Sequence, residues 1–399
     1  MKIVITGASG FVGRSLVRFL AEQGHRLLLV GRNPEQLSNE FAAHESCGYD
    51  DLELRAQGWD RLVHLAVVNN NSAAGAEEFH KVNVDLTMDV ALKAQRAGIL
   101  RFVNVSSIHA LDEDNASAYA ESKRAAVRML ASLTGIDVVT VYLPLVYGER
   151  WAGRLAPLNK LPRPVARFLF GLFAALKPTV NVRRLGEFVL TETPSDPDGL
   201  VILSDGQRTN PWYVITMRVV DLTFALGVVV LLGWALLAIW ALVRLRSPGP
   251  GIFAQTRVGK HAKHFVCYKF RTMKVGTPQS GTHEASASAI TPFGQFLRST
   301  KLDELPQVWN LLRNEMTLIG PRPCLPVQTE LIEARRSRGV FAVKPGISGL
   351  AQINGIDMSD PQKLSKWDSR YIALQCLTLD LKIALATIRG GGQGDKISR

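Results

Sequence analysis

Two adjacent carboxylates, Asp303 and Glu304, are the residues of this chain best suited to covalent chemistry. Arg298 precedes them, and Arg322 follows in a Gly-Pro-Arg-Pro turn whose prolines fix the backbone. An acidic pair beside arginines suits phosphate chemistry, because one carboxylate can attack phosphorus while its neighbour holds a divalent cation that neutralises phosphate oxygens. Acidic residues are also common in the first turn of a helix, so the pair alone does not identify a site.

A second set of residues, near the N-terminus, suits the binding of a dinucleotide. An apolar strand expected at 2–6 leads into a glycine-rich turn and then a helical pattern. Glycines in this order let the backbone approach a pyrophosphate, whose charge then lies at the helix N-terminus. The turn supplies Gly7, Gly10, Phe11, Val12 and Gly13.

The loop after the second strand bears on the choice of cofactor. Arg32 stands where an acidic residue would bind the 2′-hydroxyl of NAD. We therefore expect NADP(H) in preference to NAD. The alternative is that Arg32 is an ordinary solvated loop charge.

Tyr119 and Lys123 lie four residues apart on an expected helix, so they share one face. A neighbouring ammonium can lower the pKa of a phenol towards a range that is useful for proton transfer. The pair follows a strand expected at 101–107, which ends in Ser106-Ser107. Such pairs are common on helix surfaces. A catalytic interpretation of this pair is supported only because it follows the glycine turn.

The elements that would hold these residues divide the chain into two expected domains, 1–210 and 211–399. The 399 residues are 47% hydrophobic, which is ample for two cores. In the first half, strands alternate with helices, one of them expected at 76–97, which is typical of a doubly wound parallel α/β sheet. The expected strands lie at 2–6, 26–30, 61–66 and 101–107.

The second half begins with a hydrophobic helix expected at about 219–243. Residues 222–243 carry no charge, and a straight helix of this length would extend about 33 Å, enough to cross a bilayer. Arginines flank both ends, so charge gives no direction of insertion. Only Gly227 and Gly233 would permit a bend, so the helix is either spanning or re-entrant.

The net charge of +12 favours anionic partners: nucleic acid, anionic lipid or phosphorylated substrates. No helix-turn-helix, zinc or RNA-recognition pattern is present, so we expect no nucleic-acid partner. Four scattered cysteines without a CxxC motif indicate a reducing compartment, and the chain opens on a strand pattern, so no signal peptide is expected. The basic segment 255–274 suits lipid headgroups and substrate phosphates, and it contains Arg257, Lys269 and Arg271.

Two other segments have a distinctive composition. The run 161–178 is rich in Phe, Leu and Ala and also carries basic residues. We expect it to be a substrate-lobe or interdomain helix, with an interfacial lipid-binding helix as the alternative. The Gly- and Ser-rich stretch from Val275 to Ala289 is expected to be a loop that covers the site.

The chain from about Arg218 to Arg389 resembles the bacterial sugar transferases, which are monotopic phosphoglycosyl transferases acting on polyprenol phosphate. Five ordered blocks carry the resemblance: FAQTRVGK (Phe253–Lys260), YKFRTM (Tyr268–Met273), FLRSTKLDELPQVWN (Phe296–Asn310), LIGPRP (Leu318–Pro323) and VKPGISGLAQING (Val343–Gly355). The resemblance implies a mostly α-helical, membrane-associated domain. It also implies that Asp303 attacks a UDP-sugar, expels UMP and passes the phosphosugar to undecaprenyl phosphate.

The same resemblance assigns further roles. Glu304 would hold Mg²⁺, while Arg298 and Arg322 would stabilise phosphoryl charge. Asp368 and Asp380 match acidic positions of the family, although helix capping or salt bridging is the favoured interpretation of both. The chain departs from the family at Ile356, where an arginine is common, and it lacks the Ser-Pro that breaks the hydrophobic helix.

The first half resembles the extended short-chain dehydrogenases/reductases that act as nucleotide-sugar epimerases and reductases. The shared motifs are the glycine turn, Ser106-Ser107, the Tyr119/Lys123 pair, His64-Leu65-Ala66, Val82-Asn83 and Pro144–Gly148. By resemblance the fold is Rossmann-like, Tyr119 is the general acid/base, Lys123 holds the cofactor ribose, and Ser107 rather than Ser106 orients the substrate. Leu143 replaces a usual arginine, and the substrate lobe is short.

Together the two resemblances imply a bifunctional enzyme at the cytoplasmic face of a bacterial inner membrane. Its first half would reduce a UDP-4-keto-6-deoxy-HexNAc with NADPH. The alternatives are a 4-epimerase and a non-catalytic, nucleotide-binding module that regulates or dimerises the transferase. A homodimer is therefore one option that the sequence leaves open.

Overall fold

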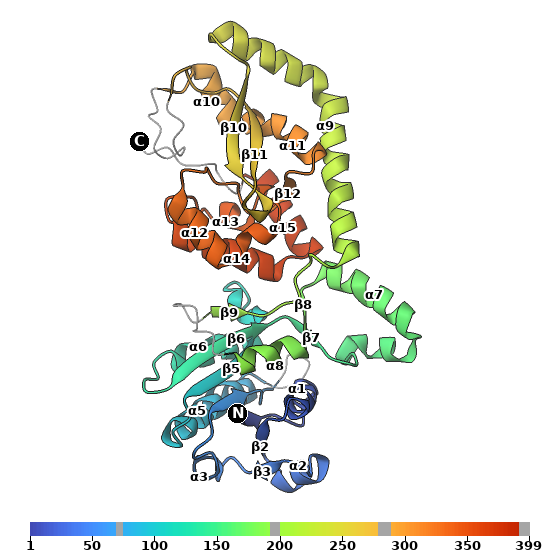
Figure 1. Cartoon of the computed structure of the whole chain (residues 1–399), viewed down its shortest axis with the longest axis vertical. Helices are drawn as coiled ribbons and strands as arrows, with labels where there is room; N and C mark the ends of the chain where they lie inside the picture. The colour runs from blue at the N-terminus through green and yellow to red at the C-terminus, as the bar shows by residue number, and fades with distance from the viewer. Residues whose placement is uncertain (69–74, 192–199, 278–288, 391–399) are drawn as a thin grey trace. The chain divides into compact units, whose positions relative to one another are not determined.

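The computed structural model describes residues 1–68, 75–191, 200–277 and 289–390. They form two compact units (Figure 1): 1–170 with 178–205, and 171–177 with 206–399. The short segment 171–177, which precedes the expected domain boundary, therefore belongs with the second unit. Most of the loop expected between Val275 and Ala289 lies outside the described residues.

The first unit is built on a seven-stranded sheet of order β3-β2-β1-β4-β5-β6-β9, in which every pairing is parallel. The order reverses between β1 and β4, which makes the sheet doubly wound, as the sequence predicted. The strands are β1 (Lys2–Thr6), β2 (Arg26–Val30), β3 (Glu45–Cys47), β4 (Arg61–His64), β5 (Arg101–Ser107), β6 (Asp137–Leu143) and β9 (Leu200–Ile202).

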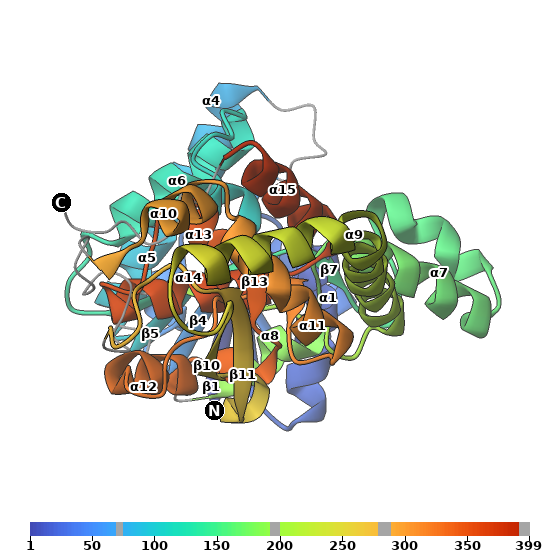
Figure 2. The same ribbon diagram turned by 90° about the horizontal axis from the view of Figure 1, so that it is seen from above.

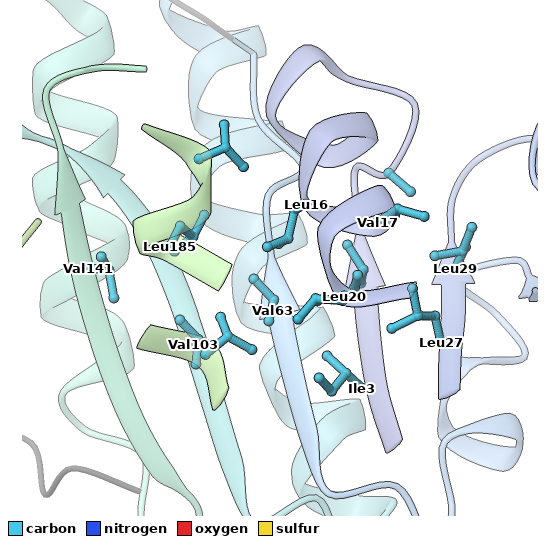
Figure 3. Close-up of a cluster of buried hydrophobic side chains, with 14 of the residues drawn as sticks. Ile3, Leu16, Val17, Leu20, Leu27, Leu29, Val63, Val103, Val141 and Leu185 are labelled. Atoms are coloured by element: carbon cyan, nitrogen blue, oxygen red, sulfur yellow. The ribbon is translucent and has the colours of Figure 1, made fainter. Parts of the chain in front are cut away.

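Alternation along the strands places apolar side chains on both faces of this sheet. Ile3 and Ile5 join one buried cluster, and Val4 joins the other. Figure 3 shows the first cluster, where Leu16 and Leu20 of α1 and Leu185 of α8 pack on the strands. The helices of this unit are α1 (Phe11–Glu22), α2 (Pro34–Glu40), α3 (Leu52–Arg55), α4 (Ala76–His80), α5 (Leu86–Arg96), α6 (Ala118–Leu130) and α8 (Val182–Leu190).

The helix expected at 76–97 is not uniform. α4 and α5 are joined by a π-helical turn, Lys81–Asp85, which contains the buried Asn83. Such turns often occur at functional sites. A separate two-stranded parallel sheet pairs β7 (Leu145–Tyr147) with β8 (Thr179–Asn181), and α7 (Arg163–Leu176) lies between them in the chain.

The second unit is mostly helical. Its strands form an antiparallel hairpin, β10 with β11, and a short parallel pair, β12 with β13. The strands are β10 (Ile252–Val258), β11 (His264–Phe270), β12 (Thr317–Ile319) and β13 (Gly346–Ser348). The helices are α9 (Pro211–Arg246), α10 (Pro292–Ser299), α11 (Val308–Leu312), α12 (Thr329–Ser337), α13 (Leu350–Ile353), α14 (Pro361–Leu374) and α15 (Leu377–Ile388).

The apolar helix α9 is longer than the expected 219–243 and bends part-way along its length (Figures 1 and 2). Near its start, Arg218 donates to the carbonyls of Leu311 and Leu312, at 2.6 and 3.0 Å. Near its end, Val243 packs in a cluster with residues of β11 and α10. Both ends of α9 are therefore anchored to the same unit.

Candidate active sites

Glu304 is the centre of the first candidate site. It lies in a 3₁₀ turn, Leu302–Gln307, directly before α11. Its Oε1 accepts from Lys269 Nζ of β11 at 2.6 Å and from Arg322 Nη2 at 3.2 Å. Burial opposes its ionisation, but the charges of Lys269 and Arg322 outweigh this and lower its pKa to about 2. Glu304 is therefore a fixed anion between two cations at neutral pH.

Asp303 has the opposite electrostatic character. Its side chain is buried, and burial together with the negative charge of Glu304 raises its pKa to about 6. The cations Lys269, Arg298 and Arg322 act in the other direction and limit the shift. The two neighbouring carboxylates thus have well-separated pKa values, which is typical of groups with different roles.

The Gly-Pro-Arg-Pro turn that carries Arg322 is held by close backbone contact. A Cβ on Gly346, the first residue of β13, would lie 2.1 Å from the nitrogen of Gly320, which follows β12. The two backbones can come this close only because both residues are glycine. Arg335 of α12 adds a second support, since its Nη1 donates to the Arg322 carbonyl at 2.8 Å. The position of the Arg322 guanidinium thus depends on the segments around it.

A small open hollow adjoins Glu304. Three of the predicted phosphate-binding residues, Lys269, Arg322 and Arg257, line it. The sequence analysis missed its other lining residues: Cys267, Gln307, Pro323, Gly346 and Ile347. Cys267 could have been found, because it lies two residues before Lys269 on one strand and so shares its face.

Two other predicted phosphate-binding arginines do not line this hollow. Arg298 Nε donates to Thr272 Oγ1 at 3.1 Å, and its charge acts on Asp303. Arg271 donates to the carbonyls of Ser247 and Pro248, so it secures the turn that follows α9. The structure therefore does not bring Arg271 together with the carboxylates.

The two further acidic residues have structural partners. Asp368 accepts from Arg335 Nε at 2.9 Å in a buried ion pair. Asp380 accepts from the hydroxyls of Tyr213 and Tyr371, at 2.5 and 2.8 Å. Both arrangements agree with the structural interpretation favoured for these residues.

Replacing Arg335 with alanine should destabilise the second unit by about 3–5 kcal/mol, because Asp368 would remain buried without its cation. Thermal unfolding in detergent measures this. The matched control is the adjacent Arg336→Ala, whose exposed pair with Glu333 should contribute about 1 kcal/mol or less. A double variant, Arg335→Met with Asp368→Leu, should recover most of the loss. Equal effects of the two single arginine variants would contradict this assignment.

The second candidate site lies in the first unit, at the glycine turn between β1 and α1. Gly7 has a positive φ of 72°, and a Cβ on Gly13 would lie 2.3 Å from the Gly7 carbonyl oxygen. Gly10 precedes α1 directly as its N-cap residue. The turn thus brings bare backbone against the N-terminus of a twelve-residue helix, and these residues fit the pyrophosphate of a dinucleotide.

Tyr119 and Lys123 share α6 as predicted, but their electrostatics differ from the expectation. The pKa of Tyr119 is raised, because burial outweighs its hydrogen bond with Ser107. Burial also lowers the pKa of Lys123 to about 7, so this residue carries only part of a positive charge. The expected lowering of the Tyr119 pKa by Lys123 is therefore wrong for this structure. Ser107, and not Ser106, is the serine bonded to Tyr119.

The remaining motif residues of this unit form a buried polar network. His64 is bonded through its two ring nitrogens to Thr6 and Thr87, at 2.8 and 3.0 Å. Burial and the charge of Lys123 lower its pKa to about 3, so it is neutral. Asn83 Nδ2 donates to Ser122 Oγ of α6 at 3.0 Å. This network fixes β4 and the π-helical turn against the helix that carries Tyr119.

Comparison with known proteins matches each half of the chain to a family. Residues 212–392 match the family described as bacterial sugar transferase, and residues 3–184 match the NAD dependent epimerase/dehydratase family. EpsL, an uncharacterized sugar transferase of Bacillus subtilis (strain 168), is 38% identical over 180 residues, which cover 44% of this chain and 87% of that protein. The chain belongs to the bacterial sugar transferase family. Both resemblances seen in the sequence are confirmed.

Two further relatives match less than half of this chain. The UDP-glucose:undecaprenyl-phosphate glucose-1-phosphate transferase of Escherichia coli (strain K12) is 38% identical over 44% of this chain and 39% of its own length. The UDP-N-acetylgalactosamine-undecaprenyl-phosphate N-acetylgalactosaminephosphotransferase of Aeromonas hydrophila is 35% identical over 45% and 44%, respectively. The matches thus span less than half of these two relatives.

Solved structures were also compared with this chain. The UDP-N-acetylglucosamine 4-epimerase of Bacillus cereus aligns with 52% of this chain and 76% of its own, at 18% identity and a TM-score of 0.40. The assignment of this half to a Rossmann-like fold agrees with its own strand order and with its family match.

Proposed function

We propose that the transferase half moves a sugar 1-phosphate from a UDP-sugar to undecaprenyl phosphate and releases UMP. The observation that carries the proposal is the pairing of Asp303 with Glu304 inside a cluster of three cations. The site offers an ionisable carboxylate beside charges that can balance a diphosphate. The activities for which two transferase relatives are named support this substrate class.

Asp303 is the proposed nucleophile. One carboxylate oxygen forms a bond to the sugar-proximal phosphorus, and the bond from that phosphorus to the UMP oxygen breaks with its electron pair. An oxygen of undecaprenyl phosphate then attacks the same phosphorus and displaces Asp303 as a carboxylate. Lys269, Arg322 and Arg257, around the hollow, balance the phosphate charge in both steps.

Magnesium fits the donors of this site. Glu304 is ionised at neutral pH and offers hard oxygen ligands, as Mg²⁺ requires. Within the described ranges no group of three or more His, Cys, Asp or Glu side chains could form a complete metal cage. Sites of this kind complete their coordination with water and substrate phosphates. When bound, the ion would neutralise diphosphate oxygens.

We further propose that α9 is re-entrant and that both halves face the cytoplasm of a bacterial inner membrane. α9 is long and apolar enough to span a membrane, and much of its middle is exposed. However, Arg218 and Val243 both pack on one unit, whereas a crossing helix would carry its two ends to opposite faces. The bend of α9 supports entry and return on one side.

The transferase proposal is tested by supplying a panel of radiolabelled UDP-sugars, Mg²⁺ and undecaprenyl phosphate to the detergent-solubilised protein. Label should move into the organic phase with one or more of the sugars, in amounts that match UMP formation. Label that stays in water with every sugar would contradict the proposal.

The pH profile should reflect Asp303. Because its raised pKa is about 6, the nucleophilic carboxylate is ionised above that pH, and turnover should fall as pH drops through it. Lys269 lowers this pKa, so Lys269→Gln should move the acidic limb of kcat/KM to higher pH. The matched control is Lys382→Gln, because Lys382 is an exposed lysine of α15 and is not among the charges that shift the Asp303 pKa. An unmoved limb in Lys269→Gln would contradict the assignment.

For the first half we propose reduction of a UDP-4-keto-6-deoxy-HexNAc by NADPH. Hydride would pass from NADPH to C4, and Tyr119 would donate the proton to the carbonyl oxygen. A phenol whose pKa is raised stays protonated at neutral pH, and this supports donation in preference to proton removal. Arg32, in the loop after β2, supports NADPH over NADH.

Epimerisation at C4 and a non-catalytic regulatory role are the competing proposals for this half. The family match, which names epimerases and dehydratases, favours the first of them. Reduction consumes NADPH in equal amount to the keto-sugar, whereas epimerisation consumes none overall. Following absorbance at 340 nm with the 4-keto sugar therefore separates reduction from the other two proposals: stoichiometric loss of NADPH supports reduction, and its absence contradicts it.

A further inference from the structure

The helix α7 (Arg163–Leu176) has an unusual distribution of side chains. Five large apolar residues recur at i, i+3, i+4, i+7 and i+11, which places them on one helical face. Each is 38–50% exposed: Val165, Phe168, Leu169, Leu172 and Leu176. The other positions of the helix include the buried Ala166, Ala174 and Ala175, and Phe170, whose ring packs against Tyr147 and Trp151. α7 thus packs part of its surface on the protein and leaves a five-residue apolar stripe exposed.

The C-terminal half of α7 is fixed to the start of α9. Gly171 approaches Trp212 so closely that a Cβ would lie 2.9 Å from the indole ring. Asn210 Nδ2 donates to the Gly171 carbonyl at 3.0 Å, and Gln207 Nε2 donates to that of Ala174 at 2.6 Å. Figure 1 shows α7 beside the first turns of α9. The position of α7 therefore follows that of the apolar helix.

The exposed apolar surface continues from α7 into α9. Val214, Ile215 and Val219, in the first turns of α9, are each about half exposed. The segment 151–186, which contains α7, has no Asp or Glu, although Arg184 of this segment pairs with Asp205 at 3.2 Å. The basic residues of this segment are Arg154, Lys160, Arg163, Arg167, Lys177, Arg183 and Arg184. An apolar stripe within a cationic segment is the pattern of a helix that lies in an anionic membrane interface.

We propose that α7 lies in the plane of the bilayer surface, with Leu169 and Leu172 among the acyl chains, as a second membrane contact beside α9. The proposal favours the interfacial alternative over the substrate-lobe or interdomain role expected from the sequence. The inference rests on the proposed insertion of α9. It adds the cations of this segment to the arginines of α9 as contacts for anionic phospholipid, and it holds the first turns of α9 at the membrane surface.

Site-specific fluorescence tests this proposal. All four native cysteines are buried, so a cysteine introduced at an exposed position can be labelled with nitrobenzoxadiazole in the folded chain. The full-length protein would carry the probe at Leu172→Cys on α7. Leu231→Cys, on the exposed middle of α9, reports membrane insertion, and Leu100→Cys, exposed on the first unit, is the aqueous control. Each of the three labelled variants would be placed in nanodiscs that contain phosphatidylglycerol and doxyl-labelled lipid.

Doxyl lipid should quench the probes at 172 and 231 at least about threefold more than the probe at 100, and iodide should quench mainly the probe at 100. Quenching at 231 but not at 172 would overturn the inference while leaving the insertion of α9 intact. No quenching at 231 would contradict the proposed membrane association itself. A third outcome is that the probe at 172 is shielded from both quenchers in discs that hold two chains and is quenched only in discs that hold one chain. A second copy would then cover α7, and the inference would be wrong.

Discussion

Asp303→Asn should reduce steady-state UMP release by a factor of about 10³ or more, because the amide cannot form the proposed acyl phosphate. The substitution is nearly isosteric, and Glu304 keeps its bonds to Lys269 and Arg322. Removing a buried carboxylate whose pKa is raised should not destabilise the fold. We therefore expect an intact thermal unfolding profile together with lost turnover.

Glu333→Gln is the matched control for this result. It removes a carboxylate from the same unit, but its side chain is exposed and pairs only with Arg336 on the surface. Its turnover should stay within about twofold of the wild type. Near-wild-type UMP release from Asp303→Asn, measured with protein purified from cells lacking related transferases, would refute the nucleophile assignment.

Tyr119→Phe should slow NADPH oxidation with a 4-keto sugar by about 10²–10⁴-fold, since it removes the proposed proton donor. Binding of NADPH should change little, because the glycine turn and the helix that follows it are untouched. Stopped-flow measurement of hydride transfer, alongside fluorescence titration of NADPH, separates the two effects. The transferase reaction of the same variant, supplied with a preformed UDP-sugar, should be unchanged.

Ser107→Ala gives a second test, since Ser107 hydrogen-bonds with Tyr119 and lowers its pKa. Loss of that bond should raise the Tyr119 pKa further and move the basic limb of the pH profile upward. Unaltered NADPH oxidation in Tyr119→Phe would instead refute the assignment of Tyr119 as the proton donor.

Much of the first unit was predictable because its signals are local. Strands at 2–6, 26–30 and 101–107 are short apolar runs, and the structure has β1, β2 and β5 at those bounds. The glycine turn was predictable for the same reason, because Gly7 and Gly13 must be glycine wherever the backbone comes this close. The π-helical turn at 81–85 was not, because no local residue pattern distinguishes it from the helix around it.

The electrostatics of both sites depended on burial, which the sequence does not give directly. The spacing of Tyr119 and Lys123 placed them on one face, but it could not show that Lys123 is buried and so loses part of its charge. Likewise, Asp303 and Glu304 are neighbours in the chain, yet only the fold decides that Lys269 and Arg322 pair with Glu304.

Long-range contacts account for the remaining differences. Arg271 lies in a basic block with Lys269, but its guanidinium bonds to the turn after α9, some twenty residues away in the chain. The bend of α9 arises in a helix without an internal proline, where both ends are held by one unit. Neither feature has a signal in the residues adjacent to it.

The most direct test of the central claim is the release of UMP in the absence of undecaprenyl phosphate. Rapid mixing of the protein with Mg²⁺ and its UDP-sugar should give a burst of about one UMP per active site, followed by arrest, because Asp303 holds the phosphosugar until the lipid acceptor arrives. Asp303→Asn should show no burst. UMP that appears only when undecaprenyl phosphate is added would mean that the lipid attacks the UDP-sugar directly, and the account given for Asp303 would be wrong.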